Sequence, residues 1–148
     1  MRSLYFDELR LGERFTTDTY AVSEAQITAF AAEFDPQPFH IDDAAARASA
    51  FGGLIASGWH TAAISMRLIV DGPLQFAGGV VGLGAEVSWP IPTRPGDVLR
   101  VVSEILELRP SRSRPDRGVV TVRNETLNQR GEVVQMLVAK LLVPNRPR

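Results

Sequence analysis

The chain has 148 residues, the size of one ordinary domain, and 45% of them are hydrophobic, which is enough for a substantial core. Its net charge of −1 gives no overall field to recruit nucleic acid or an anionic membrane, and the absence of cysteine excludes disulfides, thiolate metal sites and a cysteine nucleophile. No apolar run approaches the roughly 20 residues that span a bilayer, and residues 1–8 turn acidic too early for a secretory signal. We therefore expect a single domain over residues 1–148, located in the cytoplasm, with no nucleic-acid or membrane partner.

The N-terminal part predicts a strand followed by a helix. The turn Gly12-Glu13 precedes a candidate first strand over 14–22. Ser23 and Gln26 then form a capping-box pattern, which predicts the start of a helix. The apolar residues that follow recur at helical spacing and define one stripe: Ile27, Phe30, Ala31 and Phe34.

Two prolines, Pro36 and Pro38, end this helix, and we expect a stiff, extended connector there because each proline pushes its predecessor toward extended geometry. Residues 42–47 predict a short helix with an acidic start. Ser57 is an N-cap residue type for a second long helix, Gly58–Val70. Its apolar positions predict the face that packs on a sheet: Trp59, Ala62, Ala63, Met66 and Val70.

The second half of the chain changes from helical to strand periodicity. Four segments rich in Val, Leu, Ile and Thr are strand candidates, and Pro95-Gly96 between two of them suits a type II turn. The segments cover residues 80–89, 98–108, 118–128 and 132–143. One strand, then helices, then about four antiparallel strands predicts an α+β fold, with a curved antiparallel sheet wrapped around the helix 58–70.

Asp35 and His40 are the residues with the clearest chemical potential. Hydration of a carbon–carbon double bond beside a carbonyl needs water to lose a proton as it attacks the β-carbon, and the α-carbon to gain one. A carboxylate and an imidazole around one water can move both protons if their environments separate their pKa values. On spacing alone, a capped turn is the competing interpretation, because Asp and His beside prolines are common in loops.

The stretch from Ala29 to Asp71 resembles the MaoC-like dehydratase and (R)-specific enoyl-CoA hydratase family. The family's motif, Asp, two residues, Pro, one residue and His, is matched in order and spacing by Asp35, Pro38 and His40. The resemblance implies the single-domain hot-dog fold of that family. It also implies reversible hydration of a 2-enoyl thioester, enoyl-CoA to (R)-3-hydroxyacyl-CoA, in a homodimer or larger homo-oligomer.

The same resemblance assigns roles to residues. Asp35 and His40 would activate water, and the main-chain N–H of Gly58 would bind the thioester oxygen as it gains enolate charge. The first N–H groups of a helix lack intrahelical partners, and the helix dipole favours an anion there, which supports this role independently. Three departures concern the substrate: Gln37 stands where many members have Asn, Ser57 where His is frequent, and Met66 where some hydratases have a polar residue.

Further candidates for substrate binding flank the helix start. Gln37, Ser57 and Trp59 adjoin the proposed catalytic residues in the sequence. His60 could form a pocket wall or contact the thioester, or it could be a helix histidine bonded to a neighbour. The tryptophans Trp59 and Trp89 could line an acyl pocket or pack in the core.

An arginine-rich loop over residues 109–118 is a second type of candidate. Arg112 and Arg114 could bind coenzyme A phosphates, because guanidinium groups match phosphate geometry. A solvated hairpin loop is the alternative. With two histidines and no cysteine, no metal site is expected, and no cofactor other than the coenzyme A of the substrate.

Three functions remain open on the sequence. The first is hydration of an acyl-CoA or an acyl-carrier-protein thioester, and the Asp-x-x-Pro-x-His spacing favours it. The second is a thioesterase on the same fold, in which a carboxylate activates water at the carbonyl carbon. The third is a non-catalytic acyl-CoA binding subunit, suggested by Gln37 and Met66.

Overall fold

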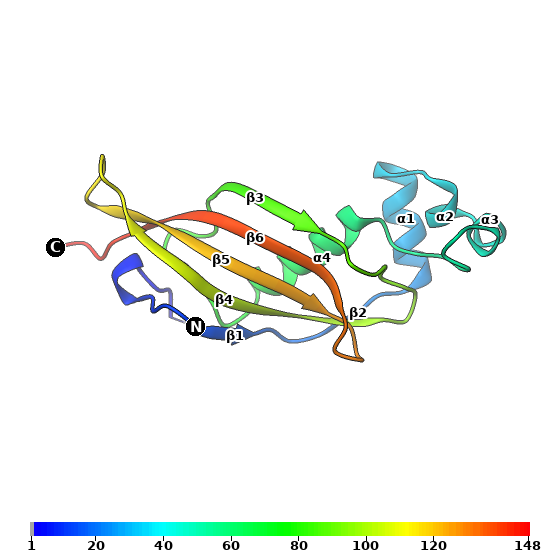
Figure 1. The fold of residues 1–148 in the computed structure, drawn as a ribbon, viewed down its shortest axis with the longest axis horizontal. Coiled ribbons are helices and arrows are strands. Elements are labelled where there is room, and N and C mark those ends of the chain that lie inside the picture. Colours follow the sequence, from blue (N-terminus) through cyan, green and yellow to red (C-terminus); the bar gives the residue numbers. More distant parts are fainter. Residues whose placement is uncertain (1) are drawn as a thin grey trace.

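The computed structural model describes residues 2–148, and it consists of a six-stranded sheet curved around one long helix (Figure 1). Every pair of neighbouring strands is antiparallel, in the order β1-β4-β5-β6-β3, and β2 pairs with the beginning of β4. The strands are β1 (Arg14–Thr16), β2 (Tyr20–Ala21), β3 (Gly82–Ser88), β4 (Val98–Pro110), β5 (Arg117–Leu127) and β6 (Val133–Pro144). The predicted α+β architecture is confirmed.

The long helix α4 lies along one face of the sheet, and the other helices gather beyond one end of it (Figure 1). The β4–β5 hairpin and the C-terminus lie at the opposite end. The helical segments are η1 (Phe6–Glu8), α1 (Glu24–Phe34), α2 (Pro38–Ile41), α3 (Asp43–Ala48) and α4 (Gly58–Val70). Among residues 2–148, no helix combines the length and the apolar character needed to cross a membrane.

Local sequence signals set several of these boundaries. Ser23 and Gln26 form the predicted capping box at the start of α1, and Ser57 caps α4 by accepting a hydrogen bond from the Trp59 N–H. Gly96 has φ +86°, and the Asp97 N–H donates to the Arg94 carbonyl, as a type II turn requires. Strand β5, predicted over residues 118–128, alternates strictly between buried and half-buried residues, so one of its faces lies in the core.

The predicted first strand over 14–22 is instead two short strands. Residues 17–19 lie between them because Thr17 bonds to Val101 of β4 through its side chain as well as its main chain. The predicted extended connector after α1 is also wrong in part. Gln37 is extended, but Pro38 begins one turn of helix, α2, that carries His40. Proline is favoured at this first helical position because no intrahelical N–H is needed there.

The face of α4 that packs on the sheet is not the predicted one. Trp59, Met66 and Val70 are between 48% and 61% exposed, whereas Ile64 and Leu68 are buried with the polar residues His60, Thr61 and Ser65. The buried hydroxyls are satisfied, because Thr61 donates to Thr93 and Ser65 donates to the Thr61 carbonyl while pairing with Thr126. Satisfied hydroxyls cost little to bury, so hydropathy alone selected the wrong stripe.

Candidate active site

Asp35 and His40 approach each other at the junction of α1 and α2. Asp35 follows the last residue of α1, and His40 lies in the single turn of α2, so that their side chains meet at 3.3 Å between Oδ2 and Nε2. The imidazole is buried, with 5% of its side chain exposed, and the carboxylate is 19% exposed. The structure therefore brings the predicted pair together across the two prolines.

The main chain fixes the orientation of the His40 ring. Nδ1 lies 2.7 Å from the carbonyl oxygen of Ile55. A carbonyl only accepts, so Nδ1 carries the hydrogen of this bond. In the neutral ring, Nε2 then presents a lone pair to the Asp35 carboxylate, which is also an acceptor. A water molecule between two such acceptors can donate one hydrogen to each, which leaves its oxygen lone pairs free.

Hydrogen-bond donors hold the Asp35 carboxylate in its charged form. The Gln37 amide donates to Oδ1 at 2.6 Å. This bond, followed by one from the Ser57 hydroxyl, lowers the pKa of Asp35 below its ordinary value, although burial acts in the opposite direction. His40 lowers the pKa further. The longer Gln37 side chain thus still reaches the carboxylate.

Gly58 begins α4 beside this pair. No hydrogen-bond acceptor for its N–H is found within residues 2–148, as expected for the first residue of a helix. A Cβ atom at this position would lie 2.6 Å from the indole of Trp89, closer than real Cβ contacts. Only glycine therefore allows Trp89 to cover the start of α4, and the buried Ser57 links the same helix start to Asp35.

His40 and Gly58 line one cavity of about 250 Å³, which we call the outer cavity. Its wall is mostly apolar, with Thr61 and Thr93 as polar exceptions. The other residues that line it are Phe51, Ile55, Ala56, Trp89, Pro90, Ile91, Pro92 and Val134. An imidazole, a main-chain N–H donor and an apolar wall are therefore available to one molecule bound in the outer cavity.

The other candidates near the helix start have distinct surroundings. Trp59 is 61% exposed and contacts Trp89 edge-on, with ring centroids 5.2 Å apart, so neither tryptophan is a core residue of this chain. His60 is buried and stacks on Phe30 at 4.6 Å. Its Nδ1 has no hydrogen-bond partner among the described residues, so the predicted hydrogen bond from His60 to a neighbouring residue is not made by this atom. Burial lowers the pKa of His60.

Arg112 and Arg114 are not brought to this site within one chain. They lie in the loop between β4 and β5, at the end of the sheet opposite α1, α2 and α3 (Figure 1). Their proposed contact with coenzyme A phosphates stays a prediction. The described residues also contain no group of three or more His, Cys, Asp or Glu that could hold a metal ion.

Sequence reasoning missed the residues that join the site to the sheet. The Trp89 indole Nε1 donates to Gln135 Oε1 at 2.9 Å, which connects the residue covering Gly58 to strand β6. The Ile55 carbonyl that holds His40 was missed too. Neither has a local signal, because one contact spans 46 residues and the other uses a main-chain atom.

A curved antiparallel sheet wrapped around one long helix is the architecture of the hot-dog fold, which this chain shares with solved (R)-hydratases. The sequence profile of the MaoC like domain matches residues 8–129. The chain therefore belongs to the MaoC-like domain family.

Individual relatives agree with this membership. A MaoC-like dehydratase from Rhodospirillum rubrum, with a known crystal structure, is 57% identical, with 99% of this chain and 100% of that chain covered and a TM-score of 0.96. The 3-hydroxybutyryl-CoA dehydratase of Methylorubrum extorquens is 30% identical over 77% of this chain and 71% of its own length. The R-hydratase PhaJ1 of Pseudomonas aeruginosa is 28% identical over 97% and 88%, with a TM-score of 0.74. Together they support a hydratase or dehydratase.

Proposed function

We propose that the protein catalyses the reversible hydration of a 2-enoyl-CoA to an (R)-3-hydroxyacyl-CoA. The observation that carries the proposal is the contact between Asp35 Oδ2 and His40 Nε2, at 3.3 Å, in a site that also contains the free N–H of Gly58. His40 and Gly58 line the outer cavity, whose mostly apolar wall would limit the competition from bulk water for a bound substrate.

The reaction divides between the three groups. Asp35 and His40 hold one water, and a proton passes from that water to the pair as the oxygen attacks the β-carbon. The pair returns one proton to the α-carbon, so that the enzyme ends in its starting charge state. The lowered pKa of Asp35 keeps its carboxylate ionised near neutral pH, so that it can hold the water by accepting a hydrogen bond from it. The Gly58 N–H stabilises the enolate oxygen, which is typically worth about 3 kcal/mol in the transition state.

The decisive test replaces each proton carrier in turn. Asp35→Asn and His40→Ala should each lower kcat for hydration of but-2-enoyl-CoA and hex-2-enoyl-CoA roughly a hundredfold or more, because each removes a proton carrier. The loss of the enoyl absorbance measures the reaction, and circular dichroism checks the fold. Asp43→Asn is the matched control, because Asp43 is a half-exposed carboxylate that pairs with Arg47 on the surface of α3.

Full activity of both variants would contradict the proposal. A thiol reagent added to the same assays distinguishes the thioesterase alternative, because only hydrolysis releases free coenzyme A. Saturable binding without turnover of any enoyl or hydroxyacyl substrate would instead support the non-catalytic binding subunit.

A homodimer is the assembly that the surface supports. Within residues 2–148 only β6 pairs with β3, and the open edge of β3 carries Leu83, which is 57% exposed. Exposed apolar residues on an unpaired strand edge favour pairing with a second chain. Leu83→Arg should therefore shift the sedimentation coefficient toward the monomer. Leu11→Arg, at an equally exposed leucine outside the sheet, should leave it unchanged.

A further inference from the structure

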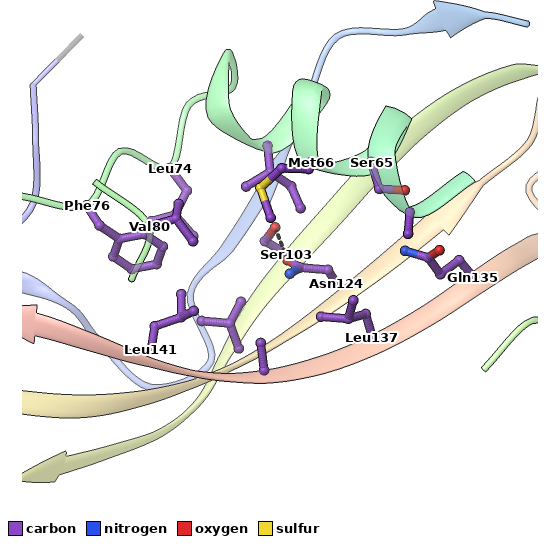
Figure 2. A pocket seen from close by; sticks show the side chains of 14 residues that line it. Ser65, Met66, Leu74, Phe76, Val80, Ser103, Asn124, Gln135, Leu137 and Leu141 are labelled. Atoms are coloured by element: carbon purple, nitrogen blue, oxygen red, sulfur yellow. Dashed lines mark hydrogen bonds between the residues drawn. The ribbon is translucent and has the colours of Figure 1, made fainter. Parts of the chain in front are cut away.

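A second cavity, which we call the inner cavity, lies between α4 and the sheet (Figure 2). Its volume is about 60 Å³, and its walls are mostly apolar. Two amide side chains, Asn124 and Gln135, project into it from β5 and β6 (Figure 2). The remaining residues that line it are Ala62, Ser65, Met66, Ile69, Leu74, Phe76, Val80, Ser103, Val122, Leu137, Ala139 and Leu141.

The orientation of the Gln135 amide is fixed by its neighbour. The Trp89 indole can only donate a hydrogen bond, so the atom that it contacts must be the carbonyl oxygen of Gln135. The Nε2 amino group therefore points away from Trp89. Gln135 is only 1% exposed, and no acceptor for Nε2 is found within residues 2–148.

Asn124 offers a second free amino group. Ser103, its cross-strand neighbour on β4, donates to Oδ1 at 2.6 Å, and Nδ2 has no partner in the described part of the chain. The hydroxyls of Ser65 and Thr126 nearby are already paired with each other. The unused hydrogen-bonding capacity of the cavity thus consists of amide N–H donors.

The buried side-chain atoms without a partner among the described residues belong to Glu13 and His60, so the two amino groups here are accessible from the cavity. A ligand that fills the cavity with apolar atoms alone would bury both donors without a partner, at a desolvation cost, whereas an acceptor on the ligand offsets this cost. Among the described residues that line the cavity, none is ionisable, so a carboxylate would find no cation to balance its charge. The cavity therefore suits a neutral oxygen. Its volume is also below the roughly 150 Å³ of a cavity that holds benzene, which restricts the group to a few atoms.

Trp89 links residues of the two cavities. Its indole covers Gly58, which lines the outer cavity, and donates a hydrogen bond to Gln135, which lines the inner cavity. A chain that leaves a thioester bound at the Gly58 N–H and passes Trp89 reaches Gln135 next.

We propose that the inner cavity receives the end of the acyl chain, and that this chain is short and carries a neutral oxygen acceptor (an ether, a hydroxyl or a keto group) beyond the double bond. The oxygen accepts hydrogen bonds from Gln135 Nε2 and Asn124 Nδ2. This inference rests on the proposed hydration of an enoyl thioester, because it names the substrate class for that site.

Substrates of equal length test the inference. 4-Methoxybut-2-enoyl-CoA and 5-hydroxypent-2-enoyl-CoA have the same number of chain atoms as hex-2-enoyl-CoA but contain an oxygen. We expect kcat/KM to be about tenfold higher for at least one of them, as one buried hydrogen bond would give. Equal or higher kcat/KM for hex-2-enoyl-CoA than for both overturns the inference while leaving the proposed function intact.

Two variants test whether the preference for an oxygenated acyl chain arises in the inner cavity. Gln135→Met should abolish it, and the double change Asn124→Leu with Ser103→Ala should reduce it while keeping an apolar, well-packed pair. The second variant protects the test if Gln135→Met fails to fold. Gln129→Met, the same change in the turn between β5 and β6, should preserve the preference.

Binding of unreactive analogues separates this inference from the proposed function. Calorimetry should show tighter binding of 4-methoxybutanoyl-CoA or 5-hydroxypentanoyl-CoA than of hexanoyl-CoA, again about tenfold. Tighter binding of such an analogue without hydration of any enoyl-CoA would overturn the function and support the inference. Binding of both oxygenated analogues no tighter than hexanoyl-CoA would overturn the inference.

Discussion

The outer cavity, which Trp89 lines, and the inner cavity, which its partner Gln135 lines, differ in the polar groups that they offer. The outer cavity contains His40, which contacts Asp35, together with a free main-chain N–H, whereas the inner cavity contains only neutral side chains. Groups that change their charge suit proton transfer, and fixed neutral donors suit recognition of an atom that does not react. The rate of hydration and the preference among acyl chains should therefore respond to different substitutions.

The largest effect is expected from Gly58→Ala. The new Cβ would meet the Trp89 indole at 2.6 Å, so the ring or the helix start must move, and the N–H loses its alignment with the thioester oxygen. We expect kcat/KM to fall about a hundredfold for every substrate, because all of them share the thioester oxygen that the N–H would bind. Steady-state hydration assays with the oxygenated and hydrocarbon substrates measure this.

Two controls accompany that variant. Gly53→Ala should be harmless, because its Cβ would make only an ordinary 3.6 Å contact with Arg94. Combining Gly58→Ala with Trp89→Ala should restore part of the activity by giving the Cβ space. If Gly58→Ala is fully active, the oxyanion role of this helix start is wrong.

A smaller effect is expected from Trp89→Phe, which removes the hydrogen bond between Trp89 and Gln135. The ring still covers Gly58, but the donor to Gln135 Oε1 is lost. We expect the free energy of unfolding in urea to fall by about 1–3 kcal/mol, because a buried carbonyl is left without a partner. The ratio of kcat/KM for the oxygenated substrates to that for hex-2-enoyl-CoA should decrease, because the Gln135 amide can then rotate. Turnover of hex-2-enoyl-CoA should persist.

Trp59→Phe is the matched change for that experiment. Trp59 is exposed, and its indole N–H has no bond to the part of the chain that the structure describes. Its unfolding free energy should stay within about 0.5 kcal/mol of the unsubstituted protein. An equal decrease in unfolding free energy in Trp89→Phe and Trp59→Phe would show that the Trp89–Gln135 hydrogen bond does not stabilise the protein.

The smallest effect concerns pH and His60, which lies beside the outer cavity without a partner at Nδ1. Burial lowers the pKa of His60 in the folded protein from its ordinary 6.5. As pH falls below 6.5, the unfolded chain therefore binds a proton before the folded chain does, and stability decreases. The unfolding free energy should fall between about pH 6.5 and the lower folded pKa.

The variant His60→Phe keeps a ring for stacking on Phe30 and removes the titration. Its stability should be flatter over the same pH range, as measured by urea unfolding at successive pH values. The contribution of Asp35 belongs to a different window, because its pKa is lowered from 3.8, so that its stabilisation is lost only at more acidic pH. Identical pH profiles for His60→Phe and the unsubstituted protein would exclude His60 as the cause.

Signals that act over a few residues predicted their structures correctly. The capping box of Ser23 and Gln26 predicted the start of α1, Ser57 predicted the start of α4, and strand periodicity predicted β5 to within one residue at each end. The orientation of α4 was not predictable in this way. Both sides of α4 are apolar enough to be buried. The side that carries Thr61 and Ser65 faces the sheet, where their hydroxyls pair with Thr93 and Thr126, which are distant in the sequence.

The contacts of the site also separate into those that a short motif predicts and those that depend on long-range packing. Asp35 and His40 lie within six residues and match the family's Asp-x-x-Pro-x-His motif, so the sequence could single them out, and the structure places them 3.3 Å apart. The bond from Trp89 to Gln135 depends on how β6 pairs with its neighbours, and the pairing of Ser103 with Asn124 depends on the register of β4 and β5. Long-range register is a property of the whole sheet, which no short motif specifies.

The bond between His40 Nδ1 and the Ile55 carbonyl has a consequence for how it can be removed. The acceptor is a main-chain atom, so the bond itself does not depend on which side chain residue 55 carries. Conventional mutagenesis cannot delete it, but replacing the Ala56 amide by an ester would weaken the Ile55 carbonyl as an acceptor and loosen the ring while every side chain stays the same.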